Sequence, residues 1–211
     1  MDLRSFGYAY GVYFTTCQDC KKTFDGDKRA WRCETCASIA ESADRLSHYR
    51  LPHTTTNVMS TWDKKYLGLA RYISDWSKDP STKVGAVIAD KDHRLVSLGY
   101  NGLAQRTDDS PERLNNRDLK YKIIIHGELN AMHFANRSDL SDCTIYLWPF
   151  LSCSSCTSQI IQRGIRRVVA PAIPEDLRSR WEESLNLSIK LYEEAKTEVK
   201  LVSQEELKDL K

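Results

Sequence analysis

Hydrophobic positions along the chain repeat with a helical period in some stretches and a strand-like period in others. From Thr61, which we expect to cap the first helix, apolar residues recur at helical spacing until the DPS sequence at 79–81. Two apolar runs, 84–89 and 94–99, then predict strands joined by a DKD hairpin turn. Further along, the pattern predicts a polar loop over 101–120, helices over 126–136, 154–163 and 175–195, and strands over 144–148, 166–170 and 199–203. This alternation predicts an α/β domain in which helices cover a mixed sheet.

Seven cysteines give the first part of the chain a different character. Six of them form three C-x-x-C pairs, which in an intracellular chain favour zinc over disulfides. Two pairs lie within 15–37, separated by a turn sequence, whereas 48–61 is polar and contains a proline. We therefore predict a zinc-binding segment (1–47), a linker (48–60) and an α/β domain with a C-terminal helix (61–211). The unpaired Cys143 is expected to be a buried apolar residue.

The N-terminal cysteines form a complete ligand set. Four thiolates without an open position predict a closed, structural zinc site at Cys17, Cys20, Cys33 and Cys36. A segment this short has too little core to fold alone, so a metal would stabilise it. His48 or His53 in place of one cysteine is an alternative. Nucleic-acid binding is another, but basic and acidic residues nearly balance here, which favours a structural or subunit-contact role.

Composition narrows the function classes. The chain has 211 residues, 41% hydrophobic and 28% charged, with a net charge of +2. These values are typical of a globular protein and give no sign of a large nucleic-acid or membrane patch. No apolar run is long enough to span a membrane, and the first residues lack a secretory pattern. A cytoplasmic protein is the expectation.

The third C-x-x-C pair carries the candidate chemistry. His126 and Glu128 form an H-G-E sequence, and Cys153 and Cys156 follow it. One imidazole and two thiolates hold zinc with a fourth position open for water, and Glu128 would transfer the proton. At the first turns of two helices, these side chains reach one point. Taken singly, the histidine is more often structural, and a lone C-x-x-C can be redox-active or half of a structural zinc site.

Four ordered motifs carry a family resemblance: DPSTKVGAVI (79–88), GYNG (99–102), KYKIIIHGELNAM (120–132) and CSSCTSQIIQRGIRRVV (153–169). With them the chain resembles the zinc-dependent cytidine and deoxycytidylate deaminase superfamily, most closely its deoxycytidylate (dCMP) deaminase branch. The resemblance implies a three-layer α/β/α fold with a mixed five-stranded sheet, and makes 61–211 the catalytic domain. It implies conversion of dCMP to dUMP, regulation by dCTP and dTTP, and assembly into oligomers.

The same resemblance assigns substrate contacts. Asn101 would bind the sugar, the Gly127 N–H would bind the base carbonyl, and the base pocket would be lined by Thr82, Lys83, Val84, Gly85 and Ala86. The phosphate candidates are Arg106, Arg113, Arg117 and Lys120, with Lys122 nearby. A solvated charged loop is the alternative for each of them. Trp148 and Phe150 would suit base stacking or core packing.

This sequence departs from the family at three positions. Gly127 stands where the family usually has alanine, Ser152 where it has proline, and Ala104 where it often has proline. These departures leave the substrate open between dCMP and dCTP. A base deaminase acting on single-stranded nucleic acid or tRNA is the second hypothesis, and it requires a basic, aromatic groove. A non-enzymatic zinc module is the third.

Overall fold

The structure is a computed structural model and describes residues 3–40, 59–208 and 210. The chain forms two compact units, residues 1–53 and 54–211. The predicted linker lies largely outside the described residues, and so do His48 and His53. None of the described helices is long and apolar enough to cross a membrane.

The first unit is a small hairpin module. A short 3-10 helix, η1 (Arg4–Phe6), precedes two antiparallel strands, β1 (Tyr13–Thr16) and β2 (Thr23–Gly26), and residues 34–40 are helical. Cys17 follows β1 directly and is fully buried, and its N–H donates to the carbonyl of Lys22 at 2.9 Å. The buried apolar residues among the described part of this unit are small: Cys17, Ala30 and Ala37. The cysteine cluster therefore occupies the place that a hydrophobic core takes in larger domains.

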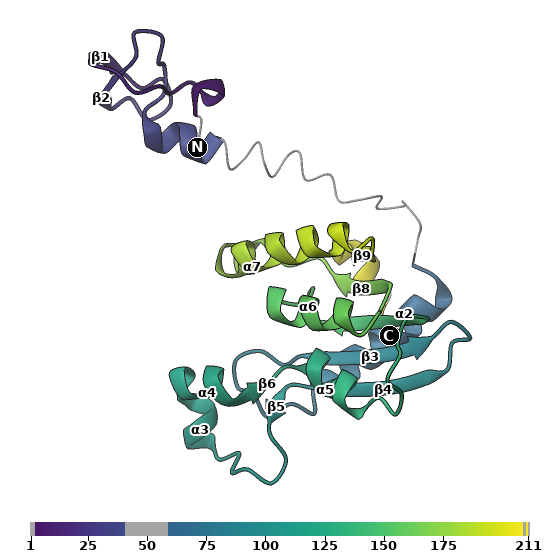
Figure 1. Cartoon of the computed structure of the whole chain (residues 1–211). Helices are drawn as coiled ribbons and strands as arrows, with labels where there is room; N and C mark the ends of the chain where they lie inside the picture. The colour runs from purple at the N-terminus through teal and green to yellow at the C-terminus, as the bar shows by residue number, and fades with distance from the viewer. Residues whose placement is uncertain (1–2, 41–58, 209, 211) are drawn as a thin grey trace. The chain divides into compact units, whose positions relative to one another are not determined.

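The second unit is built on a five-stranded sheet with the order β4-β3-β7-β8-β9 (Figure 1). The antiparallel pairs join β3 to β4 and to β7, and the parallel pairs join β7 to β8 and β8 to β9. The sheet is therefore mixed, as predicted. The strands are β3 (Gly85–Asp90), β4 (Leu95–Tyr100), β7 (Cys143–Trp148), β8 (Arg167–Pro171) and β9 (Glu198–Val202).

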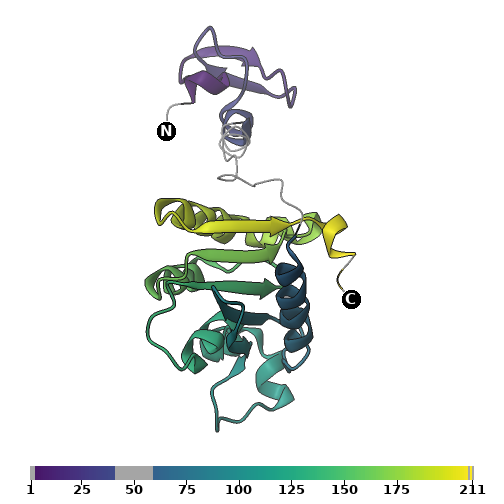
Figure 2. The same cartoon turned by 90° about the vertical axis from the view of Figure 1, so that its right-hand side faces the viewer.

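Helices cover both faces of this sheet, as Figure 2 shows. On one face, Ile88 and Ile145 pack with residues of α5, α6 and α7. On the other, Val87 and Tyr146 pack against α2 and α8. Neighbouring strand residues point to opposite faces, so each central strand contributes to both cores. The helices are α2 (Thr61–Ser74), α5 (Gly127–Phe134), α6 (Ser154–Gln162), α7 (Glu175–Glu194) and α8 (Gln204–Leu207).

The structure corrects two local predictions. Ser60, not Thr61, caps α2, because the Ser60 hydroxyl accepts from the Asp63 N–H while Asp63 accepts from the Ser60 N–H. The stretch predicted as a polar loop contains regular structure. It holds α3 (Pro111–Asn115), α4 (Arg117–Ile123) and β5 (Gly102–Leu103), which pairs with β6 (Ile124–Ile125).

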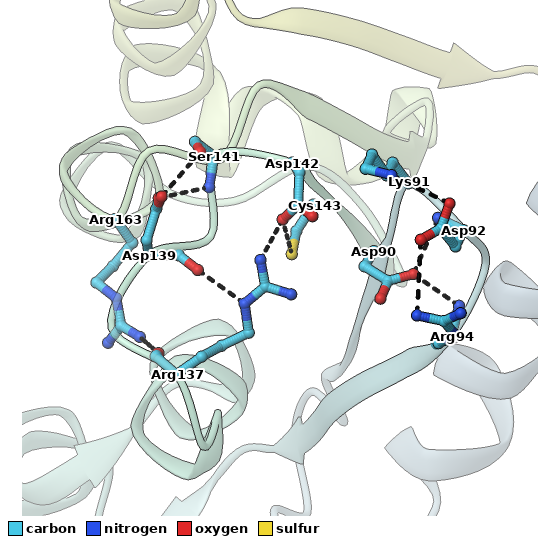
Figure 3. A network of polar contacts seen from close by, with 10 residues as sticks. All are labelled: Asp90, Lys91, Asp92, Arg94, Arg137, Asp139, Ser141, Asp142, Cys143 and Arg163. Atoms are coloured by element: carbon cyan, nitrogen blue, oxygen red, sulfur yellow. Dashed lines mark hydrogen bonds and ion pairs between the residues drawn. The ribbon is translucent and has the colours of Figure 1, made fainter.

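Polar contacts close the connection between α5 and β7 (Figure 3). Arg137 pairs with Asp142 and donates to the Asp139 carbonyl, while Arg163 donates to the Arg137 carbonyl at 2.8 Å. Cys143 lies beside Asp142 and is buried in the core, as predicted. Burial raises the pKa of its thiol to about 12, which makes it a poor nucleophile. This cluster lies at the start of β7, and the candidate site lies beyond the end of that strand.

Candidate active site

A cavity lies where β3 and the helices α5 and α6 begin and where β7 ends. Segments far apart in the sequence supply its wall. Its lining residues are Asp79, Ser81, Thr82, Val84, Asn101, Lys120, Tyr121, Ile124, His126, Glu128, Pro149, Phe150, Leu151, Cys153 and Trp181.

Two helix N-termini bring the candidate metal ligands together. His126 is the N-cap of α5, Cys153 is the N-cap of α6, and Cys156 lies in the first turn of α6. His126 Nδ1 is 3.5 Å from Cys153 Sγ and 3.2 Å from Cys156 Sγ. All three ligand atoms lie within 4.8 Å of one another. One imidazole and two thiols at this spacing suit zinc, and the helix ends favour the thiolate forms.

The pKa values of the two thiols in this cluster are shifted in opposite directions. The hydrogen bond from Cys156 lowers the pKa of Cys153 to about 4, and the same interaction raises the pKa of Cys156. The hydrogen bond to Cys153 also raises the pKa of His126. One negative charge therefore forms readily, and the second is opposed by the first. A divalent cation between the sulfurs removes that opposition, because it attracts both thiolates.

Glu128 lies beside this cluster and is 5% exposed. Burial raises the pKa of its carboxyl group. Its Oε2 has no hydrogen-bond partner among the described residues, although buried polar atoms are nearly always paired. An unpaired carboxylate oxygen next to one imidazole and two thiols is expected at a metal centre where a further polar group, such as water, binds to the metal and donates a hydrogen bond to the carboxylate. The residues present therefore fit zinc.

A buried polar network forms the wall next to Asn101. The Asn101 Oδ1 accepts from the Val84 N–H at 2.7 Å, and its Nδ2 donates to the Thr82 carbonyl at 2.9 Å and to Asp79 Oδ2 at 3.3 Å. Lys120 is 3% exposed, and its Nζ donates to Asp79 Oδ1 at 2.8 Å. The Asn101 amide is thus already engaged within the protein. It holds the Thr82–Val84 segment in place at the cavity.

The predicted base-pocket stretch, 82–86, is only partly at the cavity, because 82–84 precede β3 and 85–86 lie within it. Thr82 and Val84 line the cavity. Lys83 is exposed, and Gly85 and Ala86 are buried within β3, away from the cavity lining. The first residue of α5, Gly127, is packed closely against Val84: a Cβ added there would lie 3.0 Å from Val84 Cγ1. This contact gives a physical reason for glycine at this position.

The four phosphate candidates lie in different surroundings. Lys120 lines the cavity, but Asp79 already pairs with it. Arg113 is half-buried and pairs with Asp108, and Arg106 is exposed in a positive-φ turn. Arg117 is exposed, with its guanidinium 5.3 Å from the ring centre of Tyr121, which lines the cavity. Lys120 and Arg117 are therefore the members of the set closest to the cavity wall.

Sequence reasoning missed part of the aromatic wall. Trp181, from α7, lies with its ring centre 5.7 Å from that of Phe150, and both line the cavity. The helical period of 175–195 places Trp181 on the buried face, but nothing in that period distinguishes a cavity wall from a core. Trp148, the other stacking candidate, packs in the core on the α2 side of the sheet.

The N-terminal cysteines form a second cluster. The sulfurs of all four lie within 4.8 Å of one another. Burial raises the pKa of Cys17, but the N–H groups of Cys33, Cys20 and Asp19 outweigh this effect and lower it to about 6. This arrangement suits a tetrahedral site closed by protein ligands, with no carboxylate in the ligand set.

A carboxylate beside a metal at two helix N-termini is the arrangement used by zinc-dependent nucleobase deaminases, and the fold and cavity point to that class of hydrolytic enzyme. The family model of the cytidine and deoxycytidylate deaminase zinc-binding region matches residues 60–172. The chain belongs to this family. Zinc is accordingly its metal, and the prediction of a hydrolytic deaminase is confirmed.

Similar proteins agree with this assignment. The chain is 42% identical over 142 residues to an uncharacterized deaminase in the luxG 3′ region of Aliivibrio fischeri, which covers 67% of this chain and 94% of that protein. It is 35% identical over 113 residues to Homo sapiens deoxycytidylate deaminase, covering 51% and 63% of the two chains. The dCMP deaminase of cyanophage S-TIM5, crystallised with dCMP and dUMP, aligns with a TM-score of 0.52 at 19% identity, over 68% of this chain and 99% of that one. This last likeness shows the shared fold.

Proposed function

We propose that this protein hydrolyses the amino group of dCMP to give dUMP and ammonia. The observation that carries the proposal is the His126–Cys153–Cys156 cluster with the unpaired oxygen of buried Glu128 beside it. Relatives named deoxycytidylate deaminase support the substrate. A dCTP deaminase and a deaminase of single-stranded nucleic acid or tRNA are the alternatives. The net charge of +2 gives little support to the nucleic-acid deaminase, which requires a basic groove.

The proposed mechanism assigns one task to each group at the site. His126, Cys153 and Cys156 would hold zinc, which would supply a water that is nucleophilic near neutral pH. Glu128 accepts a proton from the attacking water and donates it to the ring nitrogen N3 of cytosine. It then carries the second proton to the departing amine, so that water and cytosine give uracil and ammonia.

The cavity wall would orient the nucleotide. Asn101 holds the Thr82–Val84 segment at the cavity. In this proposal Asn101 would also contact the sugar, and the Gly127 N–H would contact the base carbonyl. Phe150 and Trp181 provide aromatic surface for stacking. For the phosphate, the surroundings of Arg117 favour it over Arg106 and Arg113, with Lys120 behind it as the buried cation of the wall.

We also propose a second, structural zinc at Cys17, Cys20, Cys33 and Cys36, because four sulfurs converge there. Regulation by dCTP and dTTP and assembly into oligomers stay predictions from the family resemblance.

A substrate panel tests the proposed activity. The zinc-loaded full chain is incubated separately with dCMP, dCTP, CMP, deoxycytidine and a cytosine oligonucleotide, and released ammonia is measured, with Glu128→Gln protein as the blank. We expect the highest kcat/KM with dCMP. Reaction with the oligonucleotide alone would overturn the proposal, and a preference for dCTP would replace it with the dCTP alternative.

A further inference from the structure

One face of α7 carries a row of hydroxyl groups. Ser184, Ser188 and Tyr192 are spaced four residues apart, so they lie above one another along the helix. Helix α7 begins after residue 172, where the family match ends. It packs beside α6, the helix that Cys153 caps (Figure 1). We call these three hydroxyl groups the hydroxyl ladder.

Each member of the hydroxyl ladder contacts the backbone or side chain of a residue next to Cys153. The Ser154 N–H donates to Ser184 Oγ at 3.0 Å. Ser188 Oγ lies 2.9 Å from the Ser152 carbonyl oxygen and 2.9 Å from the Ser184 carbonyl oxygen of its own helix, and it can donate its proton to either. The Tyr192 OH lies 2.7 Å from Ser152 Oγ. The residues on both sides of the ligand are thereby tied to α7.

The contacts of Ser188 and Tyr192 lie in a region without solvent, whereas Ser154 and Ser184 are half-buried. Ser188 and Tyr192 are 0% exposed and Ser152 is 1% exposed. Ser152 Oγ also lies 2.8 Å from the hydroxyl of Thr157, which is on α6. A buried hydroxyl that loses its partner costs free energy, so each contact resists rearrangement of the turn. The ladder thus restrains the backbone of residues 152–154, where the φ/ψ angles decide the direction of the Cys153 side chain.

We propose that the hydroxyl ladder of α7 positions the turn bearing Cys153 for metal binding, with Ser152, Ser184, Ser188 and Tyr192 as positioning residues. The inference rests on the proposed function, in which Cys153 and Cys156 are zinc ligands. Ligands must be held within about 0.5 Å of the productive geometry. Loss of groups that orient metal ligands typically costs about 10–100-fold in metal affinity or activity.

The test follows the reactivity of each cysteine in the zinc-loaded full chain. Ser184→Ala, Ser152→Ala and Tyr192→Phe proteins are treated with iodoacetamide, and the modified cysteines are identified by mass spectrometry. We expect alkylation of Cys153 and Cys156 to become at least about 10-fold faster, because the metal is released more often. The four N-terminal cysteines are the internal control and should react at an unchanged rate.

Three further variants keep the test specific. Ser158→Ala removes an exposed hydroxyl that donates to the Ser154 carbonyl within α6 and does not reach α7 in any hydrogen bond among the described residues, and it should behave as wild type. Ser184→Thr retains a hydroxyl group and should restore slow alkylation. Ser152→Ala combined with Tyr192→Phe should have no larger effect than the stronger single change, because the two residues share one hydrogen bond. Circular dichroism checks that every variant is folded.

The possible results distinguish a wrong positioning role from a wrong zinc site. Wild-type rates at Cys153 and Cys156 in folded Ser184→Ala and Tyr192→Phe proteins would overturn the ladder and leave the zinc site intact. If zinc does not protect Cys153 and Cys156 in the wild-type chain, the proposed metal site itself is wrong, and the inference fails with it. A kcat that falls at an unchanged KM for dCMP would support the positioning role.

Discussion

The two units of this protein hold their cysteine clusters in different surroundings. In the N-terminal unit, the described buried apolar residues are Cys17, Ala30 and Ala37. The second unit has two cores that contain fully buried side chains such as Leu67, Ile145 and Tyr192. The first cluster therefore replaces a core, whereas the second is held in place by one.

The ligand sets reflect this difference. Four sulfurs would complete a tetrahedral site and leave no position for a reacting molecule. The cluster of His126, Cys153 and Cys156 supplies three ligands and has Glu128 beside it. An open position and an unpaired carboxylate, rather than C-x-x-C spacing, would distinguish the proposed catalytic cluster from the proposed structural one.

Removal of the N-terminal metal should change the protein most. In Cys20→Ser protein we expect residues 3–40 to lose their fold, because the binding of structural zinc contributes about 10–16 kcal/mol of folding free energy in small zinc modules. Hydrogen exchange should show loss of protection there, and metal analysis should fall from two zinc ions per chain to one. Deamination of dCMP should stay within about 2-fold of wild type. Cys143→Ala is the matched control and should retain two ions. A parallel loss of deamination would show that the two units depend on each other.

The next prediction distinguishes the role of the Glu128 carboxylate from that of the metal. Glu128→Gln should lower kcat by about 10²–10⁴-fold while the chain keeps its zinc, because the amide cannot transfer protons.

The same substitution should also change stability. Burial raises the folded-state pKa of Glu128 above its unfolded value, so the carboxylate form destabilises the metal-free fold at pH values above that unfolded pKa. The metal-free variant should consequently unfold at a higher temperature than metal-free wild type at pH 7. Near-normal turnover would exclude Glu128 as the proton carrier. Glu112→Gln, an exposed change, should leave kcat and melting temperature as they are.

The smallest effect concerns the core of the second unit. Asp63 on α2 accepts from Arg167 on β8 at 2.7 and 3.1 Å. Burial raises the pKa of Asp63, but the hydrogen bonds from Arg167 outweigh it, and the net shift is downward. The pair therefore stabilises the fold above the unfolded pKa of aspartate, about 3.9, and this stabilisation is lost as the pH falls through the lower folded pKa.

Urea unfolding at several pH values measures this contribution. At pH 7, Asp63→Asn should lower the free energy of unfolding by about 1.5–3 kcal/mol, and the difference from wild type should shrink as the pH falls below about 4. Asp92→Asn changes an exposed carboxylate and should alter stability by less than about 0.5 kcal/mol at any pH. A difference that persists unchanged at low pH would rule out the ion pair as its source.

Much of this arrangement is predictable from local patterns. The strand and helix periods after Thr61 predict the mixed sheet and its covering helices, since one face of each central strand is buried against helices. The same patterns place His126 and Cys153 at helix starts, as the structure shows. The pattern over 101–120 does not predict α3 and α4, because both helices are short and rich in charged residues.

Contacts between distant segments could not be predicted. The pairing of Lys120 with Asp79 joins residues 41 positions apart, and neither residue has a local pattern that predicts it. Trp181 reaches the cavity only because α7 packs beside α6. The departures at Gly127 and Ser152 gain a physical reason from the structure: the first is packed tightly against Val84, and the second has a hydrogen-bond partner on α7.

The contact between Ser152 and Tyr192 also has a consequence for how this sequence can change over evolutionary time. A proline at 152 would supply backbone rigidity of its own, but it would leave the buried Tyr192 hydroxyl with one partner fewer. A phenylalanine at 192 would in turn leave Ser152 dependent on Thr157. Neither substitution is neutral alone, so the two positions form a coupled pair. Homologues should carry serine with tyrosine, or proline with phenylalanine, more often than the mixed combinations.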